Sequence, residues 1–280
     1  MRLMRRVVRA FGRALLSAAD RERVAQLAYR DEGHGYDLFG LHPDWVMTAL
    51  GLSAPWYRHY FRVTAHGAEH IPQTGPAIVV ANHAGTLPID AVMLCLDIVE
   101  HTEPPRLPRT VVDHFVPMLP FVGTALSRVG AINGTMPNAR YLLQAGDLCL
   151  TFPEGLPAIG KPWEERYRLS PWRPGHAELA LRCHVPVVPV AIIGSEEQWP
   201  QLGRINARGV LGIPYVPIVA TPLPLPVHYH IHYGAPLTLG SDRSDDSPST
   251  EEIESAAAKT RDAVQTLLDQ GLAARQGVFR

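Results

Sequence analysis

His83 and Asp90 are the side chains of this sequence best placed for proton transfer. His83 closely follows the apolar run of residues 77–81, which we predict to be a buried strand. In an open α/β sheet, ligands bind at the carboxyl ends of the strands, so a histidine there can meet a substrate. An imidazole can take a proton from a hydroxyl group, and a nearby carboxylate holds its tautomer and stabilises the imidazolium. These positions therefore suit a general base, His83, oriented by Asp90, and the alternative is a structural histidine followed by a helix-capping aspartate.

A second candidate group, Phe152-Pro153-Glu154-Gly155, also comes at the end of a predicted strand, over residues 148–152. A carboxylate at a strand end needs partners, because an unpaired buried charge is costly. Gly155 lacks a side chain, so the backbone there can approach a ligand closely. This group therefore occupies the same kind of position as His83, at a strand end where ligands bind.

The elements that must position these groups alternate between short apolar runs and helical segments. We predict strands over residues 63–65, 77–81, 110–112, 148–152, 187–193 and 228–233, the last being a late or edge strand. We predict helices over residues 1–30, 45–50, 88–99, 119–128, 138–144, 175–183 and 251–268, the last capped by Ser249 or Thr250. This alternation predicts an α/β fold with a mainly parallel central sheet flanked by helices.

A third segment, Val-Pro-Val-Val-Pro-Val at residues 185–190, completes a pattern of motifs. In this order, the Asn82-His83 pair with Asp90, the Phe-Pro-Glu-Gly group and the proline-bearing run resemble the glycerolipid acyltransferase family, typified by the 1-acylglycerol-3-phosphate acyltransferases. Gly-Ala-Ile at residues 130–132 falls where the second motif of that family is expected. The resemblance extends over residues 61–233.

The resemblance implies direct acyl transfer from acyl-CoA or acyl-carrier-protein to a hydroxyl group, with no cofactor, no metal and no covalent acyl-enzyme. It implies that His83 takes the hydroxyl proton, that Asp90 orients His83, and that Glu154 holds the acceptor by hydrogen bonds. Backbone N–H groups near Gly155 or Gly85 would then stabilise the oxyanion. The predicted substrate-binding residues are those of the two motifs and two arginines: Asn82, Gly85, Phe152, Pro153, Glu154, Gly155, Arg166 and Arg168.

The sequence departs from the family pattern in the spacing of its histidine and aspartate. The family motif has four residues between the two, and here there are six. A continuous helix would separate His83 from Asp90 by about 10.5 Å along its axis. The two side chains can therefore meet only if residues 84–87 form a loop.

A second departure concerns the arginines expected for binding a phosphate. Leu156 and Pro157 follow the Phe-Pro-Glu-Gly motif where the family often has Thr-Arg, and residues 131–137 contain no arginine. Arginine is the natural bidentate ligand for phosphate. The sequence therefore indicates a branch of the family with divergent acceptor motifs. A lysophosphatidate or lysophospholipid acceptor, with Arg166 or Arg168 as substitute ligand, and a neutral acceptor such as diacylglycerol or a long-chain alcohol both remain open.

Two functions other than acyl transfer are the alternatives. A non-catalytic lipid-binding protein with a relict site is the alternative, although His83, Asp90 and Glu154 are all present. A lipid hydrolase is disfavoured because the sequence has no Gly-x-Ser-x-Gly nucleophile motif.

Residues 1–18 have the pattern of a basic amphipathic helix. Five arginines fall within an arc of roughly 100° when plotted on a helix, and apolar residues face the other way; the arginines are Arg2, Arg5, Arg6, Arg9 and Arg13. This pattern is typical of a helix that lies in a membrane interface, and a helix docked on the domain with its arginines in water is the alternative. No run of about twenty apolar residues exists. We therefore expect a peripheral protein on the cytoplasmic face of a membrane, without a transmembrane span.

The amino-acid composition limits the size of the core and the kinds of partner and site that are expected. Hydrophobic residues make up 46% and charged residues 19% of the 280 residues, which allows a substantial core, and a net charge of −1 does not suggest a nucleic-acid partner. Three isolated cysteines indicate free thiols, and no clustered ligands suggest a metal site. We predict an amphipathic helical segment at residues 1–55, an acyltransferase domain at 56–240 and a terminal loop and helix at 241–280.

Overall fold

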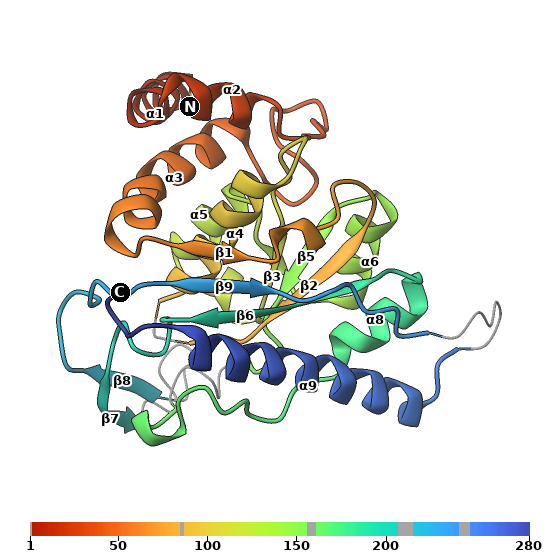
Figure 1. Cartoon of the computed structure of the whole chain (residues 1–280). Coiled ribbons are helices and arrows are strands. Elements are labelled where there is room, and N and C mark those ends of the chain that lie inside the picture. The colour runs from red at the N-terminus through yellow and green to blue at the C-terminus, as the bar shows by residue number, and fades with distance from the viewer. Residues whose placement is uncertain (1, 85–86, 156–160, 207–214, 241–246) are drawn as a thin grey trace.

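The computed structural model describes residues 2–84, 87–155, 161–206, 215–240 and 247–280. Its centre is a seven-stranded sheet in the order β1-β9-β6-β2-β5-β3-β4 (Figure 1). The strands are β1 (Thr64–His66), β2 (Ala77–Ala81), β3 (Arg109–Val112), β4 (Ile132–Asn133), β5 (Leu148–Thr151), β6 (Val187–Ile193) and β9 (His230–Tyr233). Every neighbouring pair in this sheet is parallel except β6 and β9. The prediction of a mainly parallel sheet in an α/β fold is confirmed.

Helices cover both faces of the sheet (Figure 1). They are α1 (Arg2–Leu15), α2 (Ala18–Ala25), α3 (Pro43–Pro55), α4 (Ile89–His101), α5 (Val122–Arg128), α6 (Met136–Gln144), α8 (Gly175–Cys183) and α9 (Thr250–Ala274). Successive residues of β2 point to opposite faces. Val79 belongs to the core shared with α3 and α4, whereas Ile78 and Val80 pack with residues of α6 and α8. Helix α9 packs against β6 on that second face, where Val264 and Leu268 meet Ile193.

The N-terminal segment differs from the single helix predicted over residues 1–30. The chain forms α1 and α2, separated at Leu16 and Ser17, and residues 26–30 are not helical. Ser17 accepts a hydrogen bond from the backbone N–H of Asp20 at 3.1 Å, so it caps a new helix. Periodicity alone could not show this break, because serine is also tolerated inside helices.

Glycine permits a close crossing of α1 and α3. A Cβ atom on Gly12 would lie 2.7 Å from Oγ1 of Thr48, so only glycine fits there. Leu16 and Leu50 belong to the same hydrophobic core as strands β2 and β6. The N-terminal helices thus share a core with the central sheet, and the domain boundary at residues 55–56 stays a prediction.

Several elements were not expected from the sequence. The two-residue strand β4 is too short to give a pattern, and Gly203 and Pro217 interrupt the hairpin of β7 (Gln201–Asn206) and β8 (Tyr215–Val219). Strand β9 lies between β1 and β6 instead of at the edge of the sheet. At the start of α9, Ser249 is the cap, with the reciprocal Ser249–Glu252 hydrogen bonds of a capping box.

Candidate active site

The loops that follow β2, β5, β6 and β3 converge at one end of the sheet. Strand β2 pairs in parallel with β6 on one side and with β5 on the other, and β5 pairs with β3. Their carboxyl ends therefore lie side by side. This arrangement brings His83, Glu154, Glu196 and Asp113 into one neighbourhood, although they are far apart in the chain.

His83 and Asp90 form a hydrogen-bonded pair. Nδ1 of His83 lies 2.8 Å from Oδ2 of Asp90, whose side chain is fully buried. Asp90 also accepts hydrogen bonds from the backbone N–H groups of Ala84 and Ala91, both at 2.8 Å. Because an ionised carboxylate can only accept, Nδ1 of His83 carries the hydrogen and Nε2 presents its lone pair. No residue in the described part of the chain hydrogen-bonds to Nε2.

The environment of His83 makes it a stronger base than a free histidine. Burial opposes protonation of the ring, but the charge and hydrogen bond of Asp90 outweigh burial, and Glu154 and Asp113 add to them. Together these groups raise the pKa of His83 above 6.5. The ring of Phe152 lies 4.7 Å from the His83 ring and covers it on one side. The His83 side chain keeps 14% of its surface exposed, so a substrate can reach it.

Glu154 is buried, and both of its carboxylate oxygens are occupied by groups of the protein. Oε1 lies 3.4 Å from the backbone nitrogen of His83, and Oε2 accepts the N–H of Ser170 at 2.9 Å. Lys161 places its Nζ atom 3.3 Å from the same Oε2. Glu154 therefore links the loop that carries His83 to the segment that follows residue 160.

Lys161 is a site residue that the sequence reasoning missed. Its side chain is 7% exposed, and Nζ also lies 3.2 Å from Glu196 and 2.9 Å from the carbonyl oxygen of Arg168. Burial raises the pKa of Glu196 to about 7, although Lys161 acts in the opposite direction. One signal was available: Lys161 is one of only two lysines in the chain, the other being Lys259.

The other predicted motif residues support the loops. Asn82 is buried, donating to the carbonyl of Ile192 at 3.0 Å and accepting its N–H at 2.7 Å, which extends the pairing of β2 with β6. Pro153 is buried, and its carbonyl accepts the N–H of Arg173. Gly155 has φ of +58° and donates its N–H to the carbonyl of Phe152 in a tight turn. Gly85 lies outside the described residues.

The predicted arginines occupy different positions. Arg166 stacks over the ring of Trp163, with 4.5 Å between its Cζ atom and the ring centroid. It borders a small hollow that Ala84, the neighbour of His83, also lines. The side chain of Arg168 is exposed and does not line that hollow.

Arg173, which the sequence analysis did not single out, lies beside the Phe-Pro-Glu-Gly turn. It forms an ion pair with Asp113 at 2.7 Å, and a Cβ atom on Gly155 would lie 3.5 Å from its Cζ atom. Its side chain keeps 63% of its surface exposed. Arg173 is therefore a cation next to the turn that can still reach a ligand.

Comparisons with known proteins agree with this geometry. A family model described as Acyltransferase matches residues 62–193. An uncharacterized protein of Mycobacterium tuberculosis is 35% identical over 259 residues, which cover 88% of this chain and 72% of that protein. A human protein named DGAT1/2-independent enzyme synthesizing storage lipids is 30% identical over 226 residues, covering 79% of this chain and 64% of its own length.

A solved structure has the same fold. The crystal structure of the 1-acyl-sn-glycerophosphate (LPA) acyltransferase PlsC from Thermotoga maritima superposes with a TM-score of 0.56. The match covers 99% of both chains at 16% sequence identity. At that identity, the likeness concerns the fold.

Proposed function

The chain belongs to the acyltransferase family, and on that premise we propose that it transfers a fatty acyl group from a thioester donor to a lipid hydroxyl group. The donor is acyl-CoA or acyl-carrier-protein, and no cofactor takes part. The observation that carries the proposal is the pair of His83 and Asp90 at the carboxyl end of β2, with Nε2 of His83 facing no protein partner among the described residues.

In the proposed reaction, the acceptor hydroxyl loses its proton to Nε2 of His83 while its oxygen attacks the thioester carbonyl carbon. The new C–O bond gives a tetrahedral intermediate, and Asp90 stabilises the imidazolium through Nδ1. The C–S bond then breaks, and the proton on Nε2 goes to the departing thiolate. No bond forms between the acyl group and the protein, so a single ternary complex carries the reaction.

We propose a positioning role for Glu154 in place of direct contact with the acceptor. Its oxygens already bind the backbone of His83 and Ser170 and the ammonium group of Lys161. Loss of Glu154 would release the loop of His83 from the turn after β5. The Gly155 N–H is used within its turn, so the oxyanion needs another donor, either a backbone N–H near Gly85, as the family resemblance implies, or a cationic side chain. Arg173 is the nearest exposed cation to that turn.

For the acceptor, we propose a neutral lipid such as diacylglycerol in preference to a lysophospholipid with a phosphate monoester. The absence of arginine from residues 131–137 and the pair Leu156-Pro157 support it. The structure does not describe residues 156–160. The name of the human relative, which refers to storage lipids, agrees with a neutral acceptor. Arg166 and Arg173 are the cations that would serve a phosphate-bearing acceptor.

We also propose that the protein works at a membrane surface on its cytoplasmic face. Within the described residues, no helix has the length and apolar character needed to cross a bilayer. On α1, Val7, Phe11 and Leu15 recur at helical spacing and are 59%, 50% and 37% exposed. Such an exposed apolar stripe, on a helix whose sequence is rich in arginine, suits insertion between lipid headgroups.

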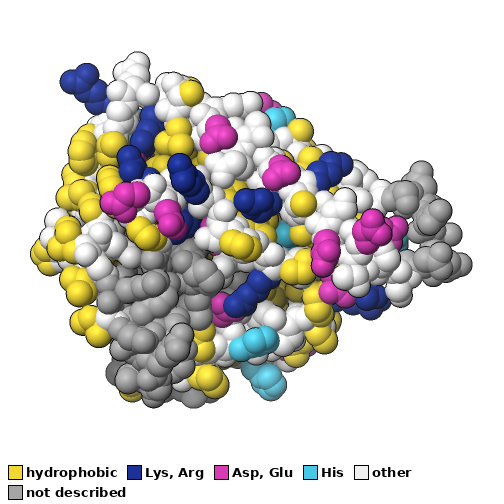
Figure 2. All heavy atoms as spheres, turned by 90° about the horizontal axis from the view of Figure 1, so that it is seen from below, with side chains coloured by type: hydrophobic (Ala, Val, Ile, Leu, Met, Phe, Trp, Pro, Cys, Tyr) yellow, Lys and Arg dark blue, Asp and Glu magenta, His cyan; other side chains and the backbone are white. Residues whose placement is uncertain are grey.

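Further exposed hydrophobic side chains support a membrane contact near the candidate active site. Met118, Phe121 and Val122 lie on the segment after β3, and Phe121 is 91% exposed. Leu202 and Ile205 on the β7–β8 hairpin are 74% and 59% exposed. Hydrophobic atoms gather along the side of the molecule where this hairpin lies, at the left of Figure 2. A bilayer against these residues would present acceptor lipids close to His83.

A thioester-release assay tests the proposed reaction. Purified protein is mixed with long-chain acyl-CoA and a panel of acceptors in vesicles, and free thiol and acylated lipid are measured together. Thiol release should require an acceptor and should disappear in the His83→Ala variant. Release without acceptor would indicate hydrolysis, and lipid binding without any release would favour the non-catalytic alternative.

A further inference from the structure

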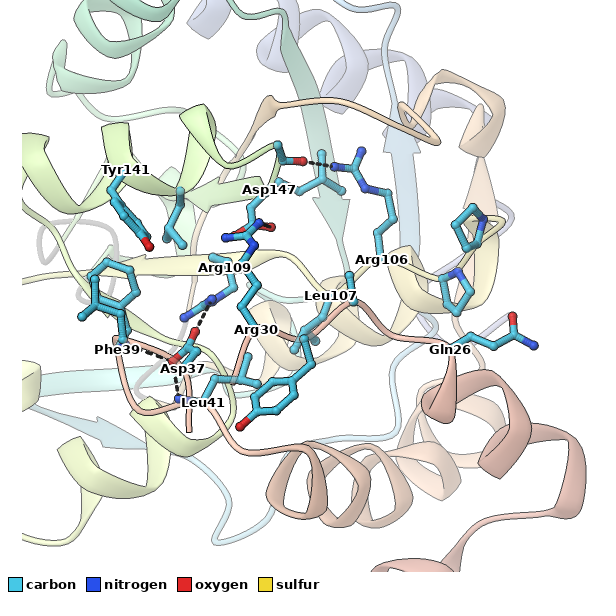
Figure 3. A pocket seen from close by; sticks show the side chains of 18 of the residues that line it. Gln26, Arg30, Asp37, Phe39, Leu41, Arg106, Leu107, Arg109, Tyr141 and Asp147 are labelled. Carbon is cyan, nitrogen blue, oxygen red and sulfur yellow. Dashed lines mark hydrogen bonds and ion pairs between the residues drawn. The ribbon is translucent and has the colours of Figure 1, made fainter. Parts of the chain in front are cut away.

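A second cleft lies at the opposite end of the sheet from His83 (Figure 3). It has a volume of about 160 Å³ and is lined by Arg109 and Leu148, the first residues of β3 and β5. Its other walls come from residues 26–41, which join α2 to α3, and from residues 104–107. The groups of the candidate active site follow the carboxyl ends of these same strands, so the cleft is separate from that site.

One guanidinium group in the cleft has an unused buried donor. Arg109 is 6% exposed, and its Nη1 atom pairs with Asp37 at 2.6 Å while its Nε atom donates to the carbonyl of Gly130 at 3.0 Å. Its Nη2 atom is buried and has no hydrogen-bond partner. Because an unmade hydrogen bond to a buried charged group is costly, a ligand acceptor in the cleft would relieve it.

A second guanidinium group brings charge that no carboxylate neutralises directly. Arg106 donates to the carbonyl oxygens of Pro72, Gly75 and Gly146, and no acidic side chain of the described chain forms an ion pair with it. Partial burial lowers the pKa of Arg106, because the charged guanidinium group loses contact with water. Two carboxylates lie nearby: Asp37 pairs with Arg109, and Asp147, whose charge also acts on Arg106, pairs with Arg30.

Arg30 and Asp147 complete the polar side of the cleft. Arg30 reaches from the segment after α2 to Asp147 at 2.7 Å and to the carbonyl of Ala145. Burial raises the pKa of Asp147 even though Arg30, Arg109 and Arg106 all act to lower it. Phe39 and Tyr141 form an apolar wall opposite these groups (Figure 3).

We propose that this cleft binds a compact oxyanion, a phosphate or carboxylate group carried by a small molecule. Guanidinium groups present planar pairs of donors that match both kinds of oxyanion. The anion would accept from Nη2 of Arg109 and balance the charge of Arg106, and its organic part would rest against Phe39 and Tyr141. Binding would clamp residues 26–41 to the sheet. The inference is independent of the proposed reaction.

Thermal unfolding tests the proposal, because a ligand that binds only the folded state raises the unfolding temperature in a saturable way. The full-length protein is titrated with sodium phosphate and, separately, with sodium acetate, each against sodium chloride at equal ionic strength. At least one oxyanion should raise the unfolding temperature and chloride should not. The two series show whether the site prefers phosphate or carboxylate.

Variants locate the binding. Arg106→Gln removes the cation whose charge the anion balances, and Arg30→Gln takes away the cation paired with Asp147, so that this carboxylate repels the anion. Each variant should therefore weaken the oxyanion Kd, by about 10- to 100-fold. For each variant, the unfolding temperature is measured with and without the anion. The shift between the two values is therefore independent of the variant's own stability. If Arg106→Gln fails to fold, Arg30→Gln decides, because that side chain is 44% exposed. Arg182→Gln, which removes an arginine paired with Glu178 on α8, is the matched control.

Three results would overturn the proposal. The first is the absence of a saturable shift with both oxyanions. The second is a shift that survives undiminished in Arg106→Gln and Arg30→Gln. The third is a shift abolished by Arg173→Ala, because Arg173 lies at the candidate active site and that loss would place the anion there.

Discussion

Nδ1 of His83 lies 2.8 Å from Oδ2 of Asp90, although six residues separate them in the chain. The contact exists because His83 leaves the end of β2 while Asp90 lies in the first turn of α4. The N–H groups of Ala84 and Ala91 hold the carboxylate in place. Negative charge is also favoured at the first turn of a helix. The longer spacing therefore still allows His83 and Asp90, the proposed base and its orienting acid, to form a hydrogen-bonded pair.

The pH dependence of acyl transfer should follow the protonation of His83. Since its pKa is raised above 6.5, the rate should fall on the acid side with an apparent pKa above that value. His83→Ala should lower turnover by about 10²- to 10⁴-fold and leave the far-UV circular dichroism unchanged. Asp90→Asn should reduce turnover and move the acid limb to lower pH, because the charge that raises the His83 pKa is gone. An acid limb that does not move in Asp90→Asn would refute its assignment to His83.

Lys161 should matter for stability much more than the other lysine of the chain. Lys161→Met would leave the buried carboxylates of Glu154 and Glu196 without their common cation. Breaking a buried pair in this way costs about 3–5 kcal/mol in the free energy of unfolding. Because the pKa of Glu196 is already about 7, that carboxyl can take up a proton at pH 5, so the loss should be larger at pH 8.

Denaturant unfolding at the two pH values measures this effect. Lys259→Met removes the exposed lysine of α9 and should change the free energy of unfolding by less than about 0.5 kcal/mol. Equal and small losses in both variants would mean that Lys161 is not the cation that holds these carboxylates together.

Membrane binding should depend on the exposed apolar face of α1. The protein should sediment with anionic vesicles, and added salt should weaken binding, since each arginine near anionic lipid contributes about 1 kcal/mol. The double variant Val7→Ser with Phe11→Ser, or deletion of residues 1–18, should leave much of the protein in the supernatant. Leu38→Ser is the control, because Leu38 is 60% exposed but lies at the second cleft. Binding that is insensitive to salt and to these changes would place the contact elsewhere, with Phe121→Ser as the next variant.

A competition assay with two acceptor lipids measures which acceptor the protein prefers. Equal amounts of diacylglycerol and lysophosphatidate are offered with one labelled acyl-CoA, and the products are separated by chromatography. Triacylglycerol should dominate, because a phosphate monoester with about 1.5–2 negative charges is costly to desolvate without a paired cation. A mixture dominated by phosphatidate would refute the neutral acceptor.

If phosphatidate dominates, two single variants would identify the arginine that binds the phosphate of the acceptor. Arg173→Ala removes the exposed cation beside Gly155, and Arg166→Ala removes the one beside Ala84. A variant that loses phosphatidate formation while keeping triacylglycerol formation would mark the arginine that binds the phosphate, whereas loss of both products in Arg173→Ala would mark Arg173 as the oxyanion donor. Arg182→Ala, on the exposed side of α8, serves as the matched control.

The sequence by itself determined the elements with strong local patterns and the residues with reactive side chains. Strands β2 and β6 and helix α8 begin and end at the predicted residues. A proline directly precedes each of them (Pro76, Pro186 and Pro174), and the two strands are apolar runs rich in Val and Ile; both signals act on neighbouring residues only. His83, Asp90 and Glu154 could be singled out for the same reason, because each directly follows or begins such an element.

Only the tertiary structure decided which of these groups meet and what surrounds them. Lys161, Glu196, Asp113 and Arg173 join the candidate site because the strand order sets β5 between β2 and β3, and β6 on the other side of β2. No local pattern carries that order, since it depends on how the sheet buries both faces at once. The same packing places Glu154, predicted from the sequence to hold the acceptor, against His83 and Lys161, and it creates the second cleft from three distant segments.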